Sequence, residues 1–189
     1  MNDPLQTTLV DAVEFLERHG VRYALVGGLA ASLRGQPRVT ADVDMVIEVD
    51  IDGALALLAD INVSKFAPLF ADVTEVVKTA FILPARHRTT GVKLDLAIGL
   101  SGFERQTIQR AETLELGSCH VTVASAEDLL VMKILAGRPQ DEQDIRGIIV
   151  AQADRIDWMY CFDLADQLGQ AVGQDLVRQL IVLRDETTS

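Results

Sequence analysis

The spacing of apolar residues predicts helices and strands in the first two thirds of the chain and helices alone after that. Over residues 4–19 the apolar positions recur with the period of an α-helix. Short apolar runs bounded by turn residues predict strands at 23–26, 43–49, 77–83, 92–98 and 114–123. Further helices are predicted at 28–33, 53–59, 141–153, 158–168 and 174–183, and one more between its N-cap Ser125 and Gly137.

This order of elements predicts an α+β fold rather than a regular alternation of strand and helix. Residues 1–124 are expected to form a mixed β-sheet flanked by helices. Residues 125–189 are expected to form a C-terminal helical part packed on that sheet. The chain has 189 residues, of which 49% are hydrophobic, and this is enough for a sizeable core.

The net charge limits the kinds of partner that we expect, and the cysteine content indicates the cellular compartment. The formal net charge of −11 argues against a bulk electrostatic grip on nucleic acid. Two cysteines and a polar N-terminus without an apolar leader predict a reducing, cytoplasmic compartment. The longest apolar runs fall short of the roughly 20 residues that span a bilayer, so no membrane association is expected.

The most informative segment joins a glycine pair to an aspartate pair. Asp42 and Asp44 flank Val43 in a predicted strand, and residues two apart on a strand share a face. Two adjacent carboxylates repel each other unless a cation lies between them, and Mg²⁺, or Mn²⁺ in its place, prefers such oxygen ligands. Gly27 and Gly28 end the preceding strand at a helix N-terminus, where bare backbone N–H groups can hold a phosphate.

A third aspartate has two interpretations. Asp95 is a lone acidic residue within the apolar run 92–98, where an isolated carboxylate is costly to bury. If its strand lies beside the strand of Asp42, three carboxylates converge and could hold two metal ions for phosphoryl transfer. Alternatively, Asp95 is the ion-pair partner of Lys93, which lies two residues earlier on the same face.

These motifs together resemble the nucleotidyltransferase superfamily that includes DNA polymerase beta. The glycine pair, Asp42-Val43-Asp44 and the later strand aspartate Asp95 occur in its characteristic order. The lead-in that contains Arg38 and Thr40 is similar to a bacterial branch containing abortive-infection type toxins. The resemblance implies a nucleotidyltransferase-like sheet fold. It also implies that the metal-binding and catalytic residues are Asp42, Asp44 and Asp95.

A later segment supports the resemblance to that branch. Lys133, Arg138, Asp141 and Asp144 resemble its helical motif, whose lysine is taken to approach the nucleotide phosphates. The chain departs from the pattern at Gly28, where many members have serine, and at Gln140, where a basic residue is common. Lys133 could instead extend from an apolar helix face, and the two aspartates could favour the helix dipole. The resemblance nominates as NTP-binding residues Gly27, Gly28, Arg38, Thr40, Lys133, Arg138, Asp141 and Asp144.

The resemblance implies a metal-dependent enzyme that moves a nucleoside monophosphate from an NTP to an acceptor. The acceptor could be tRNA or another RNA, a protein or a small molecule. Membership of the toxin branch would add an antitoxin protein as a partner. The alternative is a nucleotide-binding interaction module of the same fold with little turnover. A basic group at Lys78, Arg86, His87, Arg88 and Lys93 favours a solvated hairpin, with a grip on a phosphate-bearing acceptor as the second interpretation.

Overall fold

The computed structural model describes residues 3–117 and 119–188, and these divide into two compact units. The sheet unit comprises Met1–Leu29 and Thr40–Ala124, and the helical unit comprises Ala30–Val39 and Ser125–Ser189. Residues 30–39, which the sequence-based division assigned to the first part, therefore group with the helices. The segment that links the glycine pair to the aspartate pair passes through the helical unit.

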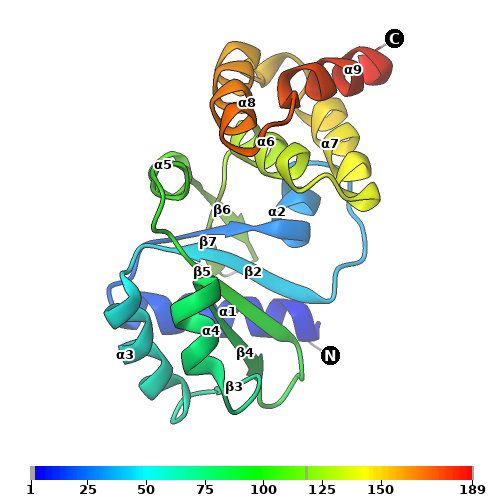
Figure 1. Cartoon of the computed structure of the whole chain (residues 1–189). Helices are drawn as coiled ribbons and strands as arrows, with labels where there is room; N and C mark the ends of the chain where they lie inside the picture. The colour runs from blue at the N-terminus through cyan, green and yellow to red at the C-terminus, as the bar shows by residue number, and fades with distance from the viewer. Residues whose placement is uncertain (1–2, 118, 189) are drawn as a thin grey trace. The chain divides into compact units, whose positions relative to one another are not determined.

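The sheet unit is built on a seven-stranded mixed sheet (Figure 1). Its strand order is β3-β4-β5-β2-β1-β7-β6, so β2 lies in the middle, between β5 and β1. The β2–β5 and β1–β7 pairs are parallel, and the other neighbours are antiparallel. The strands are β1 (Tyr23–Val26), β2 (Asp42–Ile47), β3 (Phe66–Pro68), β4 (Ile82–His87), β5 (Lys93–Ile98), β6 (Glu112–Leu116) and β7 (Cys119–Val123).

Helices cover this sheet and complete its α+β architecture. Val43 and Met45 of β2 and Leu94 and Leu96 of β5 share one face and are almost fully buried. In the sheet unit the helices are α1 (Pro4–Arg18), the first residues of α2 (Gly27–Arg34), α3 (Ile51–Ile61), α4 (Val73–Ala80) and α5 (Gly102–Arg110). The apolar face of the central strands is therefore the core, and the opposite face is free to carry polar groups.

A partly buried polar cluster fixes α1 against the core face of the sheet. The Nε2 atom of His87 on β4 lies 2.8 Å from Oδ2 of Asp11 on α1, and Thr90 N–H donates to Nδ1 of His87 (3.1 Å). Lys65 Nζ donates to the other oxygen of Asp11 at 2.5 Å. Burial raises the pKa of Asp11, but the hydrogen bonds and charges of Lys65 and His87 outweigh it and lower that pKa overall.

The helical unit starts at a capped helix. Ser125 Oγ accepts from Asp128 N–H, which confirms the predicted N-cap, and the Ser125 hydroxyl also donates to Asp128 Oδ2. Gly137 ends the same helix in the left-handed conformation. The helices of this unit are the rest of α2, α6 (Ala126–Ala136), α7 (Pro139–Gln152), a 3₁₀ turn (Ala153–Arg155), α8 (Trp158–Val172) and α9 (Leu176–Thr188).

Two predicted strands were wrong in extent or type. Residues 77–83 were predicted as a strand, but α4 occupies Val73–Ala80, and Phe81 then takes a left-handed conformation before β4. Val73 and Val77 are buried at the i, i+4 spacing of a helix, so packing overrides the β preference of this valine-rich run. Residues 114–123 form the hairpin β6–β7 rather than one strand.

The strand β3 and the helix α5 had not been predicted. β3 is only three residues long, and α5 is polar on most of its surface, so neither has a clear apolar period. Within the described residues, no helix combines the length and apolar character needed to cross a membrane.

A close backbone crossing in the helical unit leads to the first prediction. A Cβ added at Gly35 would lie 2.8 Å from Ile148 N and 2.9 Å from Ala31 O, both backbone atoms that cannot move independently. Gly35→Ala should therefore lower the free energy of unfolding by about 1–3 kcal/mol, measured by urea denaturation. Gly102→Ala is the control, because a Cβ there meets nothing within 4 Å. Equal stability of the two variants would contradict this close packing.

Candidate functional site

The register of the two central parallel strands brings the three predicted catalytic aspartates to one face of the sheet. Asp44 on β2 pairs directly with Asp95 on β5, and Asp42 pairs with Lys93. Paired residues of neighbouring strands point to the same face and lie about 4.8 Å apart. The intervening Val43 and Leu94 are buried on the other face. The sequence expectation that the strand of Asp95 lies beside that of Asp42 is therefore confirmed.

Lys93 also belongs to this group of charges. Its Nζ lies 2.5 Å from Asp95 Oδ2, which is the ion pair considered as the alternative from the sequence. The hydrogen bond to Asp95 and the charges of Asp95, Asp42 and Asp44 raise the pKa of the lysine ammonium, although burial opposes them. The ammonium is thus stabilised by all three carboxylates, and we call these four residues the acidic face.

One carboxylate oxygen of the acidic face is left without a partner. Asp95 Oδ1 is buried and accepts no hydrogen bond from the residues that the structure describes. A buried acceptor without a partner costs about 1–3 kcal/mol, and more when it is charged. The Lys93 ion pair therefore neutralises only one side of this carboxylate.

The acidic face suits a divalent cation by its chemistry, although it is not a preformed metal site. Asp42, Asp44 and Asp95 offer the carboxylate oxygens that Mg²⁺ and Mn²⁺ prefer, and Asp95 Oδ1 is an acceptor that lacks a donor. Over residues 3–117 and 119–188, no three acidic, histidine or cysteine side chains are already grouped as metal ligands. The residues therefore fit the cation, and the Lys93–Asp95 pair is the feature that a cation must displace.

The glycine pair opens α2 immediately beside the aspartates. Gly27 has a φ of +69°, which glycine adopts without strain, and Val26 before it pairs with Asp44 in the sheet. A Cβ at position 27 would lie 2.7 Å from the Cβ and Cγ atoms of Asp44 and closer still to its Oδ2. Gly27 thus leaves the space that the Asp44 carboxylate occupies, and Gly28 follows it in the first turn of the helix.

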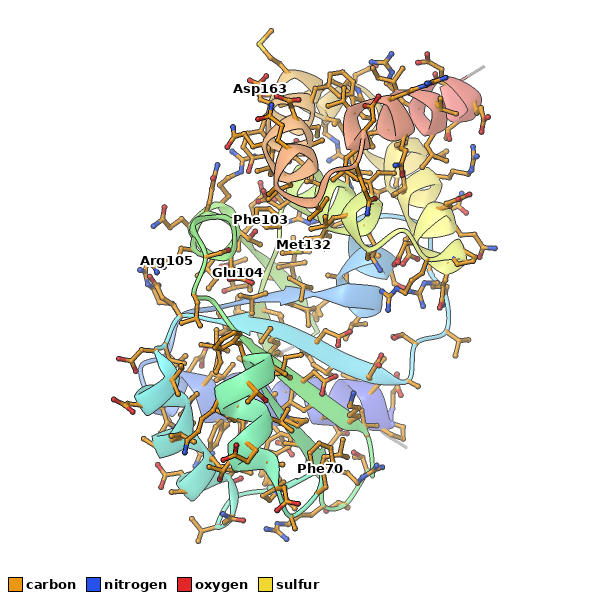
Figure 2. The ribbon with its side chains drawn as sticks, in the orientation of Figure 1. Phe70, Phe103, Glu104, Arg105, Met132 and Asp163 are labelled. Atoms are coloured by element: carbon orange, nitrogen blue, oxygen red, sulfur yellow. The ribbon has the colours of Figure 1, made fainter. Side chains whose placement is uncertain are left out.

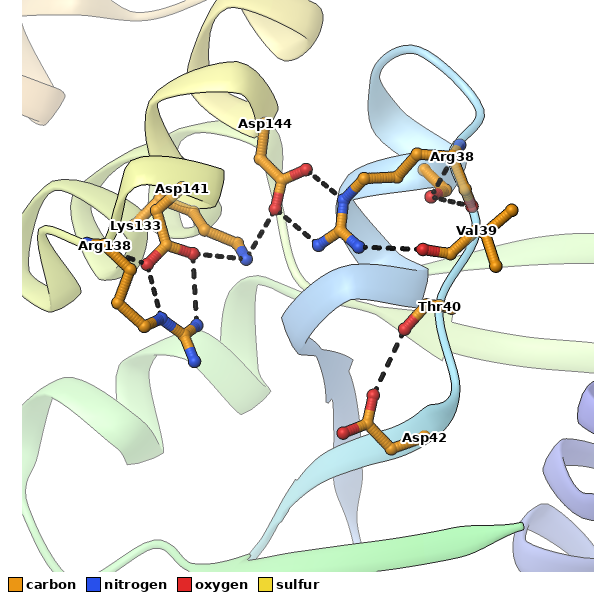
Figure 3. Close-up of polar contacts among 9 residues, drawn as sticks. Arg38, Val39, Thr40, Asp42, Lys133, Arg138, Asp141 and Asp144 are labelled. Atoms are coloured by element: carbon orange, nitrogen blue, oxygen red, sulfur yellow. Dashed lines mark hydrogen bonds and ion pairs between the residues drawn. The ribbon is translucent and has the colours of Figure 1, made fainter.

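Thr40 supports the first aspartate of the pair. Its hydroxyl donates to Asp42 Oδ1 at 3.1 Å across a single intervening residue (Figure 3). This bond fixes the side chain of Asp42 at the start of β2 and occupies one of its two oxygens. Nothing in this contact tests the predicted role of Thr40 in NTP binding, which stays a prediction.

The other predicted site residues form an ion network in the helical unit (Figure 3). Lys133 on α6 contacts both Asp141 (2.9 Å) and Asp144 (2.7 Å) of α7. Arg38 donates two hydrogen bonds to Asp144, at 2.5 and 2.8 Å. Arg138 donates to Asp141 from its side chain at 2.6 and 3.1 Å and from its backbone N–H at 3.2 Å.

This network is mostly inaccessible to solvent. The Lys133 side chain is only 4% exposed, and those of Asp141 and Asp144 are buried with it, whereas Arg138 is 69% exposed. Burial raises the pKa values of both aspartates, but hydrogen bonds from Arg138 and Lys133 to Asp141, and from Arg38 and Lys133 to Asp144, lower them overall. The observed partners of Lys133 are therefore carboxylates, and its contact with a nucleotide stays a prediction.

The basic group of residues 78–93 is not a single solvated patch. His87 is buried against Asp11, and Lys93 belongs to the acidic face. Arg88 donates to the carbonyl oxygens of Asn62 and Ser64, and Arg86 to that of Gly91. These side chains stabilise the β4–β5 hairpin and its neighbours, whereas Lys78 lies exposed on α4.

A protein-family model matches most of the chain. Residues 7–179 match the family described as "Nucleotidyltransferase of unknown function (DUF6036)". No curated protein sequence matches the chain significantly.

Two solved structures share the fold at low sequence identity. An antigenic nucleotidyltransferase-like protein from Paracoccidioides brasiliensis is 23% identical, with a TM-score of 0.52 over 95% of this chain and 93% of that one. The antibiotic-resistance factor ANT(2'')-Ia is 14% identical, with a TM-score of 0.60 over 89% of this chain and 93% of that one.

The ion network of the helical unit leads to a prediction on stability and pH. Asp144→Asn removes the carboxylate that pairs with Arg38 and Lys133. It should therefore lower the free energy of unfolding by about 3 kcal/mol at pH 7. Because the folded-state pKa of Asp144 lies below its usual 3.8, the wild type keeps this advantage above about pH 4 and loses it as pH falls through the folded value.

Urea denaturation of both proteins between pH 7 and pH 2.5 measures this effect. The gap between wild type and Asp144→Asn should narrow below about pH 4. Asp163, which is exposed on α8 (Figure 2), provides the matched control Asp163→Asn, and this variant should follow the wild type. A gap that stays constant across this range would show that the Asp144 ion pairs contribute no pH-dependent stability.

Proposed function

Because the chain belongs to this family of nucleotidyltransferases, we propose that it transfers a nucleoside monophosphate from an NTP to an acceptor with the help of a divalent cation. The pairing of Asp44 with Asp95, with Asp42 on the same face, is the observation that supports this most directly. Like charges at this spacing repel, and a cation shared by a nucleotide and the protein would neutralise them.

The proposed metal ligands are Asp42, Asp44 and Asp95, with Mg²⁺ as the expected ion and Mn²⁺ as its substitute. When bound, the ion would neutralise phosphate charge and orient the nucleotide for in-line displacement. Thr40 holds Asp42 in place through its hydroxyl, and Gly27 leaves room for Asp44. These contacts are positioning contacts, which are the main source of catalysis in phosphoryl transfer.

The nucleotide phosphates are proposed to lie at the start of α2. The backbone N–H groups of Gly27 and Gly28 would donate to phosphate oxygens there, with the positive end of the helix dipole behind them. Arg138, the exposed cation of the ion network in the helical unit, is also proposed as an NTP-binding residue. Arg38, Lys133, Asp141 and Asp144 would act in nucleotide binding by holding that network together.

Asp95 is proposed as the base for the acceptor. The acceptor oxygen would attack the α-phosphorus, its proton would pass to the Asp95 carboxylate, and pyrophosphate would leave. The acceptor is proposed to be an RNA such as tRNA, a protein hydroxyl or a small molecule. If the protein acts as a toxin, an antitoxin protein would be its partner.

A second candidate function is a nucleotide-binding interaction module with little turnover. The Lys93–Asp95 ion pair favours it, because the ammonium already contacts the carboxylate that would accept the proton of the acceptor. Incubation with each labelled NTP, Mg²⁺ and total cellular RNA, protein or small molecules separates the two functions. The enzyme should place label on one acceptor class, whereas the module should bind NTP and transfer none.

Binding of NTP should require a divalent cation. The three carboxylates of the acidic face would repel a triphosphate without one. Calorimetry of the purified protein with NTP should show binding in Mg²⁺ and none in EDTA. The double variant Asp42→Asn/Asp44→Asn should lose this metal-dependent binding and all transfer while keeping its fold, checked by circular dichroism. Equal NTP affinity with and without EDTA would rule out the metal-bridged site.

Asp95→Asn should separate binding from chemistry. Asp42 and Asp44 remain in this variant, so Mg²⁺–NTP binding should persist, while transfer should fall at least about 10²-fold through loss of the base. Binding by calorimetry and transfer of labelled nucleotide should be measured on the same preparation. The matched control is Asp163→Asn, which should keep both. Unchanged transfer in Asp95→Asn would remove Asp95 from the catalytic set.

A further inference from the structure

In the acidic face, Asp95 forms an ion pair with Lys93, and the charges of Asp42 and Asp44 also act on this lysine. Asp42 lies opposite Lys93, and Asp44 lies opposite Asp95, so the four side chains form a compact quartet on two adjacent strands. Without the lysine, three negative charges would stand on one face of the central strand pair. Lys93 reduces the formal charge of the quartet from −3 to −2.

We infer that Lys93 is a built-in counter-cation that holds Asp95 in the metal-free protein and leaves it when a divalent cation binds the three aspartates. This inference rests on the proposed metal site. It assigns to Lys93 a positioning role: the lysine holds the third carboxylate in place, and its departure frees that carboxylate for the cation and the acceptor.

The solvent exposure of Lys93 supports displacement of its ammonium by another cation rather than a permanent ion pair. Its side chain is 40% exposed, so the ammonium can retract into solvent on its flexible stem. Its ammonium donates a hydrogen bond to Asp95 Oδ2, and Asp95 Oδ1 stays buried without a hydrogen bond from the described residues. The ammonium of Lys93 therefore contacts only one oxygen of the Asp95 carboxylate. The other oxygen is left as a ligand for a divalent cation.

The chain contains a contrasting lysine that serves as an internal reference. Lys133 is 4% exposed and bridges two carboxylates, and both of these carboxylates also bind an arginine. That arrangement resembles a permanent structural ion pair, because removing any member leaves a buried charge. Lys93 differs in exposure and in its number of carboxylate contacts, which are the two properties that displacement requires.

Mn²⁺ binding to the purified full chain tests the inference without any assay of activity. Mn²⁺ is titrated by calorimetry and by its electron paramagnetic resonance signal into wild type, Lys93→Met and Lys93→Arg. Methionine keeps the length of the side chain and removes the competing charge. Lys93→Met should bind Mn²⁺ about tenfold more tightly or better, and Lys93→Arg should stay close to wild type.

Two controls separate this inference from the proposed function. Lys78→Met makes the same chemical change on the exposed surface of α4, and its Mn²⁺ affinity should remain within about twofold of wild type. Asp42→Asn/Asp44→Asn should abolish binding in both the wild-type and the Lys93→Met background. Loss of binding in the aspartate variants together with an unchanged affinity in Lys93→Met would overturn the role of Lys93 and leave the metal site standing.

The remaining outcomes are also decisive. Mn²⁺ binding that survives the aspartate substitutions, or is absent from wild type and Lys93→Met alike, would overturn both the metal site and the inference. If Lys93→Met does not fold in EDTA, it is refolded with and without Mn²⁺. Folding that Mn²⁺ restores supports the counter-cation role, and folding that Mn²⁺ does not restore overturns it.

Discussion

Repulsion between carboxylates on the central parallel strands is the constraint that organises the sheet unit. Asp44 and Asp95 are fixed opposite each other by backbone pairing, so neither can move away without breaking the β2–β5 register. Two unit charges about 4 Å apart interact by about 4 kcal/mol at the effective dielectric of a protein surface. Lys93 supplies a positive charge at this place through its ion pair with Asp95.

Two lysines with the same formal charge have different surroundings in the two units. Lys133 lies inside a network of two carboxylates and two guanidinium groups, which joins α6 and α7 and holds Arg38 beside Asp144. Lys93 lies at the half-exposed edge of the acidic face with a single carboxylate contact. The first arrangement stabilises helix packing, whereas the second is the ion pair that we propose a divalent cation displaces.

Local patterns in the sequence predicted the two strands of the acidic face. They also predicted that Asp42 and Asp44 lie on the same side of the sheet, because residues two apart on a strand point the same way. The apolar run 92–98 predicted the strand of Asp95, and the register confirmed that this strand lies beside the strand of Asp42. Sequence spacing could not reveal that Arg38 pairs with Asp144, since 106 positions separate them and only packing joins them. It also missed β3 and α5, and it misassigned α4, where burial of Val73 and Val77 overrides a strand-like composition.

The same register has consequences for both candidate functions. An enzyme needs Asp95 as a free base at the moment of transfer, and a binding module needs only the neutralisation of its charge. The observed ion pair neutralises the charge of Asp95, as a binding module requires. It leaves Asp95 free to act as a base, as an enzyme requires, only if Lys93 moves away. A lysine displaced by the cation that carries the nucleotide would release the base only when substrate is present. Coupling of this kind would keep an acidic surface stable in the absence of nucleotide and make the third carboxylate available together with the phosphate that it acts on.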